Sequence, residues 1–351
     1  MFIRHPRNPL ITPQDIQPSR PDFEVIGTFN AGATLLGDEV LLLVRVAERP
    51  KQPANGTILA PHLSASGELV ISEFKRGDAR YDSSDPRQVR DTLTGEVLLT
   101  SISHLRLARS SDGVHFSVEA QPWLAAQPPY EEFGIEDARI TQIDDAYYVN
   151  YTAVSHYGVG TSLAKTHDFQ QIERVGLIFP PANRDVTLFP QRINGLYACY
   201  HRPMPGMFGS MNMWVATSPD LKHWGQHRRV WETKAGSWEA GRVGGGAPPL
   251  YTERGWLSIY HAADPQQRYC LGAFLTAHDD PTNVLAYSAQ PVLSPDAEYE
   301  KHGFFGNVVF ACGVVLQKGM LRVYYGAADE RIALAEAPLS AVLDSLTWLK
   351  D

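Results

Sequence analysis

The stretch GIEDARITQIDDAYYVNY at residues 134–151 decides how the rest of the chain is interpreted. The pair Asp144-Asp145 separates two runs that alternate along the chain, and this pattern around a tight turn predicts a β-hairpin. Successive side chains of a strand point to opposite faces, so regular geometry does not let Glu136 and Asp137 face one ligand together. One of them is therefore a candidate catalytic acid, and the other is a supporting contact.

The same hairpin pattern occurs five times in the chain. The five copies span 28–48, 135–154, 184–203, 246–263 and 307–329. A second recurring segment, at 107–110, 163–166, 215–218 and 334–337 and less regularly at 275–278, predicts a third strand for each unit. A single small β unit cannot bury its faces alone, so five copies predict an all-β, five-bladed β-propeller that forms one domain over residues 1–351.

Polar residues open the first strand of most hairpins. They are Asn30, Asp137, Asp185 and Asn307, and Gly246 takes this place in the fourth copy. The innermost strands of a propeller converge on a central channel. We therefore expect these residues to gather at one mouth of the channel.

Composition and charge exclude several classes of function. A formal net charge of −8 argues against a nucleic-acid partner or an anionic membrane surface. Three widely spaced cysteines, Cys199, Cys270 and Cys312, without a CxxC pattern predict buried free thiols in a reducing compartment and no metal site. No segment approaches the roughly 20 apolar residues that span a bilayer, so we expect a cytoplasmic protein.

Four segments lie outside the repeated units. Residues 1–23 predict an extended arm, and the charged residues 74–96 predict an insertion in the first unit that covers the channel or contacts another copy in a homo-oligomer. The glycine-rich 241–246 predicts a loop at the channel mouth, because glycine permits close backbone approach. Residues 339–349 predict a short amphipathic C-terminal helix.

The candidate residues combine two kinds of chemistry. Carboxylates such as Asp137 and Asp329 among aromatic residues are typical of a sugar site, where rings stack and acids accept hydroxyl hydrogen bonds. Three arginines, Arg184, Arg202 and Arg242, from different units of an acidic chain indicate a small anion such as phosphate. A sugar beside phosphate is the arrangement for phosphorolysis, in which an acid protonates the leaving oxygen and phosphate attacks the anomeric carbon with inversion.

Several of these motifs resemble glycoside hydrolase family 130. They are FNAG at 29–32, GIEDAR at 134–139, NRDVTLFP at 183–190, HRP at 201–203, WEAGRVGGG at 238–246 and YYGAAD at 324–329. The resemblance covers nearly the whole chain. It implies a five-bladed β-propeller that acts on β-mannosides, most characterised members being inverting phosphorylases that release α-mannose 1-phosphate and a minority β-1,2-mannosidases.

The resemblance also implies roles for particular residues. Asp137 matches the general acid, which is thought to act through a substrate hydroxyl. Asn30, Arg45 and Asp329 match positions that hold the mannosyl unit, and Arg184, Arg202 and Arg242 match the phosphate-binding positions. We also expect substrate contacts from Glu136, His261, Tyr269 and Asn307. Inorganic phosphate is the expected co-substrate, with no cofactor and no metal.

Two alternatives to phosphorolysis of β-1,2- or β-1,4-linked manno-oligosaccharides stay open. An inverting β-1,2-mannosidase needs a carboxylate base for water, for which Glu136, Glu239 and Glu253 are candidates. A propeller that only binds sugar needs no base at all.

Overall fold

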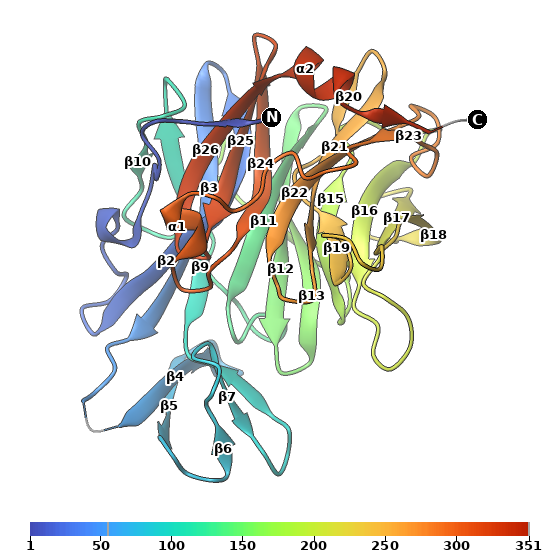
Figure 1. Ribbon diagram of the computed structural model, residues 1–351. Helices are drawn as coiled ribbons and strands as arrows, with labels where there is room; N and C mark the ends of the chain where they lie inside the picture. The colour runs from blue at the N-terminus through green and yellow to red at the C-terminus, as the bar shows by residue number, and fades with distance from the viewer. Residues whose placement is uncertain (55, 350–351) are drawn as a thin grey trace.

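The computed structural model describes residues 1–54 and 56–349, and nearly all of its regular structure is β (Figure 1). Five larger antiparallel sheets follow one another along the chain, and we number them in this order. The first sheet contains β2 (Phe23–Leu36), β3 (Glu39–Pro50), β9 (Ile102–Ser110) and β10 (Ser117–Val118), and the second contains β11 (Ile135–Ile143), β12 (Ala146–Ser155), β13 (Gly158–Thr166) and β14 (Glu173–Phe179). The third sheet contains β15 (Asn183–Leu188), β16 (Tyr197–Pro203), β17 (Met213–Ser218) and β18 (Gly225–Trp231), and the fourth contains β19 (Arg242–Gly245), β20 (Leu250–Thr252), β21 (Gly255–Ala263), β22 (Tyr269–Thr276), β23 (Val284–Tyr287) and β27 (Thr347–Trp348). The fifth sheet contains β24 (Val309–Gln317), β25 (Met320–Ala327), β26 (Arg331–Pro338) and β1 (Ile3–Arg4).

The repeated hairpins of the sequence are the first two strands of these sheets. Four of them match closely, namely β2–β3, β11–β12, β15–β16 and β24–β25. The predicted third strands are β9, β13, β17, β22 and β26, each paired with the second strand of its hairpin. The sequence pattern therefore located the hairpins of four sheets and the third strands of all five.

The fourth hairpin differs from its prediction. Its inner strand begins at Arg242, so most of the glycine-rich segment expected as a loop is strand β19, paired with β21. Glycine has low strand propensity, but the edge of β21 supplies the backbone partners that the segment needs. The prediction of a loop at 241–246 was wrong for this reason.

The two ends of the chain meet in the fifth sheet. Strand β1 pairs antiparallel with β26, so N-terminal residues complete a sheet made by the C-terminal hairpin. Ile11 continues this contact through a bridge to Ile332. The arm that precedes β2 thus lies along the last sheet.

A separate β structure is inserted between β3 and β9. It consists of the hairpin β4 (Thr57–Leu63) and β5 (Leu69–Lys75) and the three-stranded sheet β6 (Tyr81–Asp82), β7 (Gln88–Asp91) and β8 (Val97–Leu99). Figure 1 shows it projecting from one end of the larger sheets. The charged segment 74–96 makes up much of its second half.

Helices are few and short. The C-terminal helix α2 covers only Leu339–Asp344, because the chain then turns and adds β27 to the fourth sheet, so the helix predicted over 339–349 is shorter than expected. The other α-helix, α1, spans Glu298–Lys301. In the part of the chain described by the structure, no helix has the length and hydropathy needed to cross a membrane.

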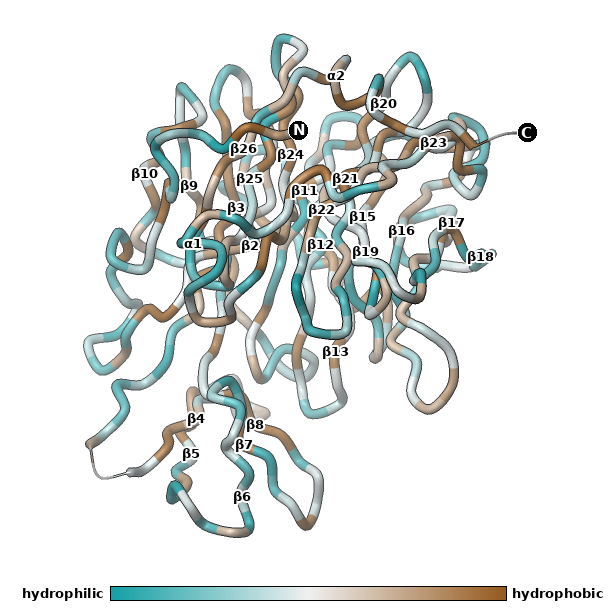
Figure 2. Tube along the Cα trace, in the orientation of Figure 1, coloured by the Kyte–Doolittle hydropathy of each residue, from teal (hydrophilic) through white to brown (hydrophobic). Residues whose placement is uncertain are grey.

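The core is divided into clusters between neighbouring sheets. One cluster joins each successive pair of sheets, and another joins the fifth sheet to the first. Members are Leu43 and Ile140 between the first and second sheets, Leu163 and Val186 between the second and third, Tyr200 and Val243 between the third and fourth, Leu271 and Val323 between the fourth and fifth, and Leu42 and Tyr324 between the fifth and first. Figure 2 shows hydrophobic stretches along these strands and hydrophilic colour on many connecting loops. The three cysteines are buried and free, as predicted.

Candidate active site

Three inner strands carry a bulge at the residue that the sequence singled out. The register of the strand pair shifts between Phe29 and Gly32 in β2, between Glu136 and Arg139 in β11, and between Arg184 and Thr187 in β15. Inside these bulges Asn30, Asp137 and Asp185 adopt φ values of 50°, 53° and 58°. Asn and Asp tolerate this left-handed conformation better than most residues, and a bulge re-aims a side chain. The bulges thus direct three polar side chains out of the regular strand pattern.

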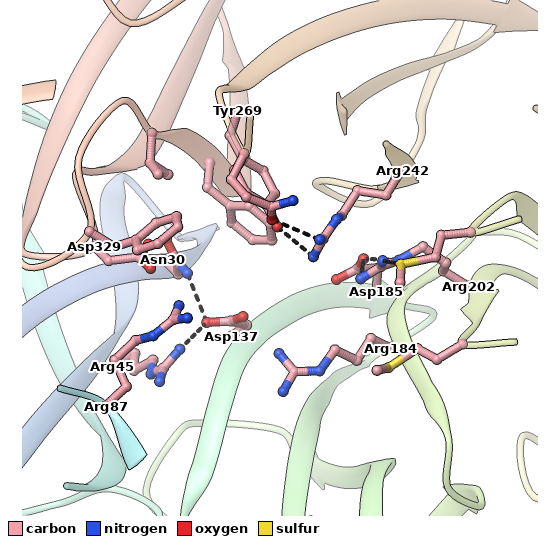
Figure 3. Close-up of a pocket in the computed structure, with 16 residues that line it drawn as sticks. Asn30, Arg45, Arg87, Asp137, Arg184, Asp185, Arg202, Arg242, Tyr269 and Asp329 are labelled. Carbon is pink, nitrogen blue, oxygen red and sulfur yellow. Dashed lines mark hydrogen bonds and ion pairs between the residues drawn. The ribbon is translucent and has the colours of Figure 1, made fainter. Parts of the chain in front are cut away.

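These side chains line a cavity of about 470 Å³. Its charged wall contains five arginines and three aspartates, namely Arg45, Arg87, Arg184, Arg202, Arg242, Asp137, Asp185 and Asp329. The cavity therefore carries an excess of positive charge within a chain whose net charge is −8. Figure 3 shows Asp137 between two groups, with Asn30, Arg45, Arg87 and Asp329 on one side and Arg184, Arg202 and Arg242 on the other.

Asp137 uses one of its two carboxylate oxygens to hold its position. Oδ1 accepts hydrogen bonds from Asn30 Nδ2 at 2.9 Å and from Arg45 Nη1 at 3.0 Å. Oδ2 has no hydrogen-bond partner among the described residues, so it is available to a ligand in the cavity. Burial raises the pKa of Asp137, but Arg45, Arg139 and the Asn30 hydrogen bond outweigh this and keep the pKa below its usual value.

Asp329 behaves in the opposite way. Burial is the largest influence and raises its pKa to about 7, with Asp137 and Glu136 adding to the increase while Arg45 and Arg87 oppose it. The residue adopts a φ of 49° at the turn after β25. Two carboxylates in one cavity thus differ in the pH range over which they bind a proton.

The opposite side of the cavity is cationic. Arg242 has only neutral partners, donating to Tyr269 Oη at 2.9 Å and to Gln267 Oε1 at 2.7 Å, and its Nε is buried without a partner. Arg184 makes one long ion pair, 3.4 Å from Nη1 to Glu136 Oε2, and its Nε is likewise unsatisfied. Two guanidiniums with unused donors indicate a site for an anion.

Asp185 neutralises and orients the third arginine. Its Oδ2 accepts a hydrogen bond from Arg202 Nε at 2.7 Å and lies 3.1 Å from His261 Nε2, and its Oδ1 accepts one from Arg139 Nη2 at 3.2 Å. Burial raises the pKa of Asp185, but Arg202, His261 and Arg139 hold it well below its usual range. A Cβ on Gly244 of β19 would lie 2.3 Å from Asp185 Oδ2, so the glycine makes room for this carboxylate.

A second cavity of about 420 Å³ adjoins the first, since Arg45, Arg87, Arg184 and Asp329 line both. Glu136 lines this second cavity, and its Oε1 accepts a hydrogen bond from Arg45 Nη2 at 2.8 Å. The inserted β structure supplies part of the wall through Asp85, Gln88, Val97 and Leu99. Phe29, Phe133 and Phe304 add aromatic faces.

The structure brings most of the predicted site residues together. Asn30, Arg45, Asp137, Arg184, Arg202, Arg242, Tyr269 and Asp329 line the first cavity, and Glu136 lines the second. The bulge in β11 explains how the adjacent Glu136 and Asp137 both contact Arg45, which regular strand geometry would not allow. Two predicted contacts line neither cavity: His261 is fully buried behind Asp185, and Asn307 is exposed.

Some lining residues had no predicted role. Asp185 was expected at the mouth of the channel but without a chemical role, and its contact with Arg202 depends on the pairing of β15 with β16. Gln267 lies in a segment without a distinguishing motif, and Arg87 lies in the charged segment 74–96, which was expected to cover the channel or contact another copy but was given no site residue. Only the folded chain brings them to the cavity. Among residues 1–54 and 56–349, no group of three or more His, Cys, Asp or Glu side chains is arranged to hold a metal ion.

Comparison with known proteins gives one consistent family. A family model described as beta-1,4-mannooligosaccharide phosphorylase matches residues 96–348. The chain is 46% identical over 348 residues to a beta-1,2-mannobiose phosphorylase of Listeria innocua, with 98% of each chain covered. The structure of the Listeria enzyme in complex with beta-1,2-mannobiose superimposes with a TM-score of 0.95. A 1,2-beta-oligomannan phosphorylase of Thermoanaerobacter is 39% identical, covering 67% of this chain and 78% of that relative. The chain belongs to glycoside hydrolase family 130.

Proposed function

We propose that the protein is a phosphorylase that cleaves β-mannosides, in particular β-1,2-mannobiose, with inorganic phosphate and releases α-mannose 1-phosphate. The observation that carries this proposal is the open Oδ2 of Asp137 in a cavity where Arg184, Arg202 and Arg242 converge. The similarity to β-1,2-specific phosphorylases over almost the whole chain favours the β-1,2 linkage over the β-1,4 linkage in the description of the family model.

The two cavities suggest where each part of the reaction takes place. The mannosyl unit is proposed to lie in the first cavity beside Asn30, Arg45 and Asp329, with Tyr269 as a further contact. Phosphate is proposed to bind the three arginines, among which Arg184 and Arg242 have unused donors that match its oxygens. The leaving sugar then occupies the second cavity, where aromatic faces and Glu136 are suited to a pyranose ring.

The chemistry follows from these positions. An oxygen of phosphate forms a bond to the anomeric carbon while the glycosidic carbon–oxygen bond breaks, and the β configuration becomes α. The leaving oxygen takes a proton that originates on Asp137, directly or through a hydroxyl group of the sugar. Asp137 must be protonated for this step. Because arginines keep its pKa low in the unliganded protein, a phosphate anion that balances their charge favours proton uptake.

The positions of the glutamates weigh against hydrolysis. Glu239 is buried and accepts hydrogen bonds from Trp231 Nε1 at 2.7 Å and Tyr260 Oη at 2.5 Å, and Glu253 is exposed in a turn. Glu136 lines the second cavity but is ion-paired with both Arg45 and Arg184. Phosphate needs no such base because it is already an anionic nucleophile.

We also infer that the five sheets are the blades of a five-bladed β-propeller. In support, each sheet shares an apolar cluster with the next and the fifth shares one with the first. A cytoplasmic location and association into a homo-oligomer stay predictions, and no cofactor is proposed beside the co-substrate phosphate.

The test is product analysis of β-1,2- and β-1,4-mannobiose incubated with the protein, with and without phosphate. We expect α-mannose 1-phosphate from the β-1,2 sugar only when phosphate is present. Free mannose at a rate independent of phosphate would make the protein a hydrolase. Asp137→Asn should abolish turnover while sugar binding remains. If the wild-type protein binds the sugar without any turnover, it is a binding protein.

A further inference from the structure

Arg87 is part of the wall of both cavities, yet no role assigned above uses it. It lies in the turn between β6 and β7, so it belongs to the inserted structure rather than to any of the five larger sheets. Figure 3 shows its guanidinium beside Arg45, on the side of Asp137 away from Arg242. The insertion therefore places the guanidinium of Arg87 at the end of the first cavity that lies away from the proposed phosphate site.

The orientation of Arg87 is set before a ligand arrives. The Arg87 side chain donates to both carboxylate oxygens of Asp85, from Nε to Oδ1 at 3.0 Å and to Oδ2 at 3.2 Å and from Nη2 to Oδ2 at 2.7 Å. Asp85 Oδ1 also accepts a hydrogen bond from the backbone N–H of Arg87 at 3.0 Å. The guanidinium lies over the ring of Phe305, with Cζ 4.6 Å from the centroid. The backbone N–H of Phe305 in turn donates to the carbonyl of Ala328, next to Asp329, at 3.0 Å. A planar group held by a bidentate pair and a ring loses little conformational freedom on binding a ligand.

One end of the guanidinium is unused. Nη1 of Arg87 makes no hydrogen bond to any described residue, and 44% of the side chain is exposed where the two cavities meet. The charged groups that share these cavities with Arg87 include its partner Asp85, the carboxylate of Asp329 and the guanidiniums of Arg45 and Arg184. With Asp85 already engaged, the free N–H groups point to a neutral acceptor in the cavity rather than to a second ion pair.

We propose that Arg87 is a specificity residue that donates hydrogen bonds through Nη1 to hydroxyl groups of the leaving sugar, and that Asp85 is the positioning residue that aims it. This inference rests on the proposed phosphorolysis and adds the group that recognises the sugar leaving the reaction. The leaving sugar is chosen over phosphate because the anion-binding arginines lie across the cavity. It is chosen over the mannosyl unit because the neighbours of Arg87 in the insertion, Asp85 and Gln88, line only the second cavity, where the leaving sugar is proposed to lie.

The reverse reaction separates the two sugars. With α-mannose 1-phosphate as donor and mannose as acceptor, Arg87→Ala should raise the KM for the acceptor by roughly ten- to hundredfold, the usual effect of losing a charged hydrogen-bond donor. The KM for the donor, and that for phosphate in the forward direction, should stay within about twofold. Arg87→Lys keeps the charge without the fork and should lie between, and Asp85→Asn should shift the acceptor KM in the same direction by less.

The matched control is Arg90→Ala, which removes an exposed arginine from β7 of the same insertion that lines neither cavity. It should leave both KM values unchanged, and thermal unfolding of all variants checks that the insertion is intact. An unchanged acceptor KM in Arg87→Ala, or an equal rise in donor and acceptor KM, overturns the inference.

Binding measurements keep this test separate from the proposed function. If the wild-type protein turns over no sugar in either direction, phosphorolysis is wrong. Calorimetric titration with β-1,2-mannobiose then still decides the role of Arg87: weaker binding to Arg87→Ala than to Arg90→Ala supports the contact, and equal binding overturns it.

Discussion

The pKa values of two carboxylates in the first cavity are shifted in opposite directions. Hydrogen bonds and nearby guanidiniums stabilise the charged form of Asp137, so its pKa is lowered. Asp329 has no hydrogen bond among the described residues, and burial raises its pKa to about 7. The difference arises from partners rather than from residue type, since both are aspartates at left-handed positions.

The raised pKa of Asp329 predicts a cost to stability at neutral and alkaline pH. Between the unfolded value of 3.8 and about 7 the folded state binds more protons than the unfolded state, so this group lowers stability as the pH rises. Asp329→Asn removes the titration. The variant should be more stable than the wild type by about 2 kcal/mol at pH 8, half of what the full shift implies because the side chain is partly exposed. At pH 4 the two should be nearly equal.

Chemical denaturation at the two pH values measures this difference. Asp38→Asn, in the exposed turn between β2 and β3, is the control and should show no such dependence on pH. A destabilising effect of Asp329→Asn at pH 8 would contradict the prediction. We expect the same variant to lose activity, because Asp329 is proposed to hold the mannosyl unit.

At the scale of elements, the site is built by departures from regular strands. Bulges in β2, β11 and β15 turn Asn30, Asp137 and Asp185 toward the cavity. In the fourth sheet the departure is the pair of glycines at the end of β19, Gly244 and Gly245, and the missing side chain of Gly244 lets Asp185 and His261 pack against its backbone. The alternating sequence pattern thus determines which segments form strands, whereas bulges and strand glycines determine the geometry of the site.

Gly244→Ala tests the packing of β19. The added Cβ would meet Asp185 Oδ2 at 2.3 Å and His261 Nε2 at 2.6 Å, both held in place by hydrogen bonds. We expect a loss of about 2 kcal/mol in the free energy of unfolding, as for other overpacked sites. Because Asp185 orients Arg202, the KM for phosphate should also rise.

Gly225→Ala is the matched control, since Gly225 opens β18 with no atom within 4 Å of its added Cβ. Its stability and its KM for phosphate should match those of the wild type. A Gly244→Ala variant as stable as this control would show that the carboxylate can move without cost.

At the scale of the whole molecule, the two ends of the chain are joined in one sheet. Strand β1 pairs with β26, and Arg4 of β1 forms an ion pair of 2.7 Å with the fully buried Glu300. Glu300 also accepts a hydrogen bond from Tyr325 Oη at 2.7 Å. The N-terminal strand therefore neutralises a charge that is buried where helix α1 packs against the fifth sheet.

Arg4→Ala should destabilise the whole fold. It leaves the carboxylate of Glu300 buried without its cation, which costs about 2–3 kcal/mol in the free energy of unfolding, the low end for such pairs because Arg4 is partly exposed. Denaturant unfolding measures the change. Arg20→Ala, which breaks the half-exposed pair with Asp22, should have almost no effect. Equal stability of the two variants would mean that the ion pair between Arg4 and Glu300 does not contribute to the stability of the fold.

Local patterns of the sequence determined the order and pairing of the strands. Alternation and turn residues located the hairpins of four sheets and the third strands of all five, because strand period and turn chemistry depend on neighbours in the chain. Motifs such as GIEDAR and NRDVTLFP also identified most of the charged residues that line the first cavity.

Only the tertiary structure decided how these residues share one site. It set Asp185 between Arg139, Arg202 and His261, left Asn307 on the surface, and brought Arg87 from the insertion to the junction of the two cavities. It also made a strand of the glycine-rich segment and shortened the final helix. These contacts join residues far apart in the chain. They depend on packing between sheets, which leaves no periodic signal in the sequence.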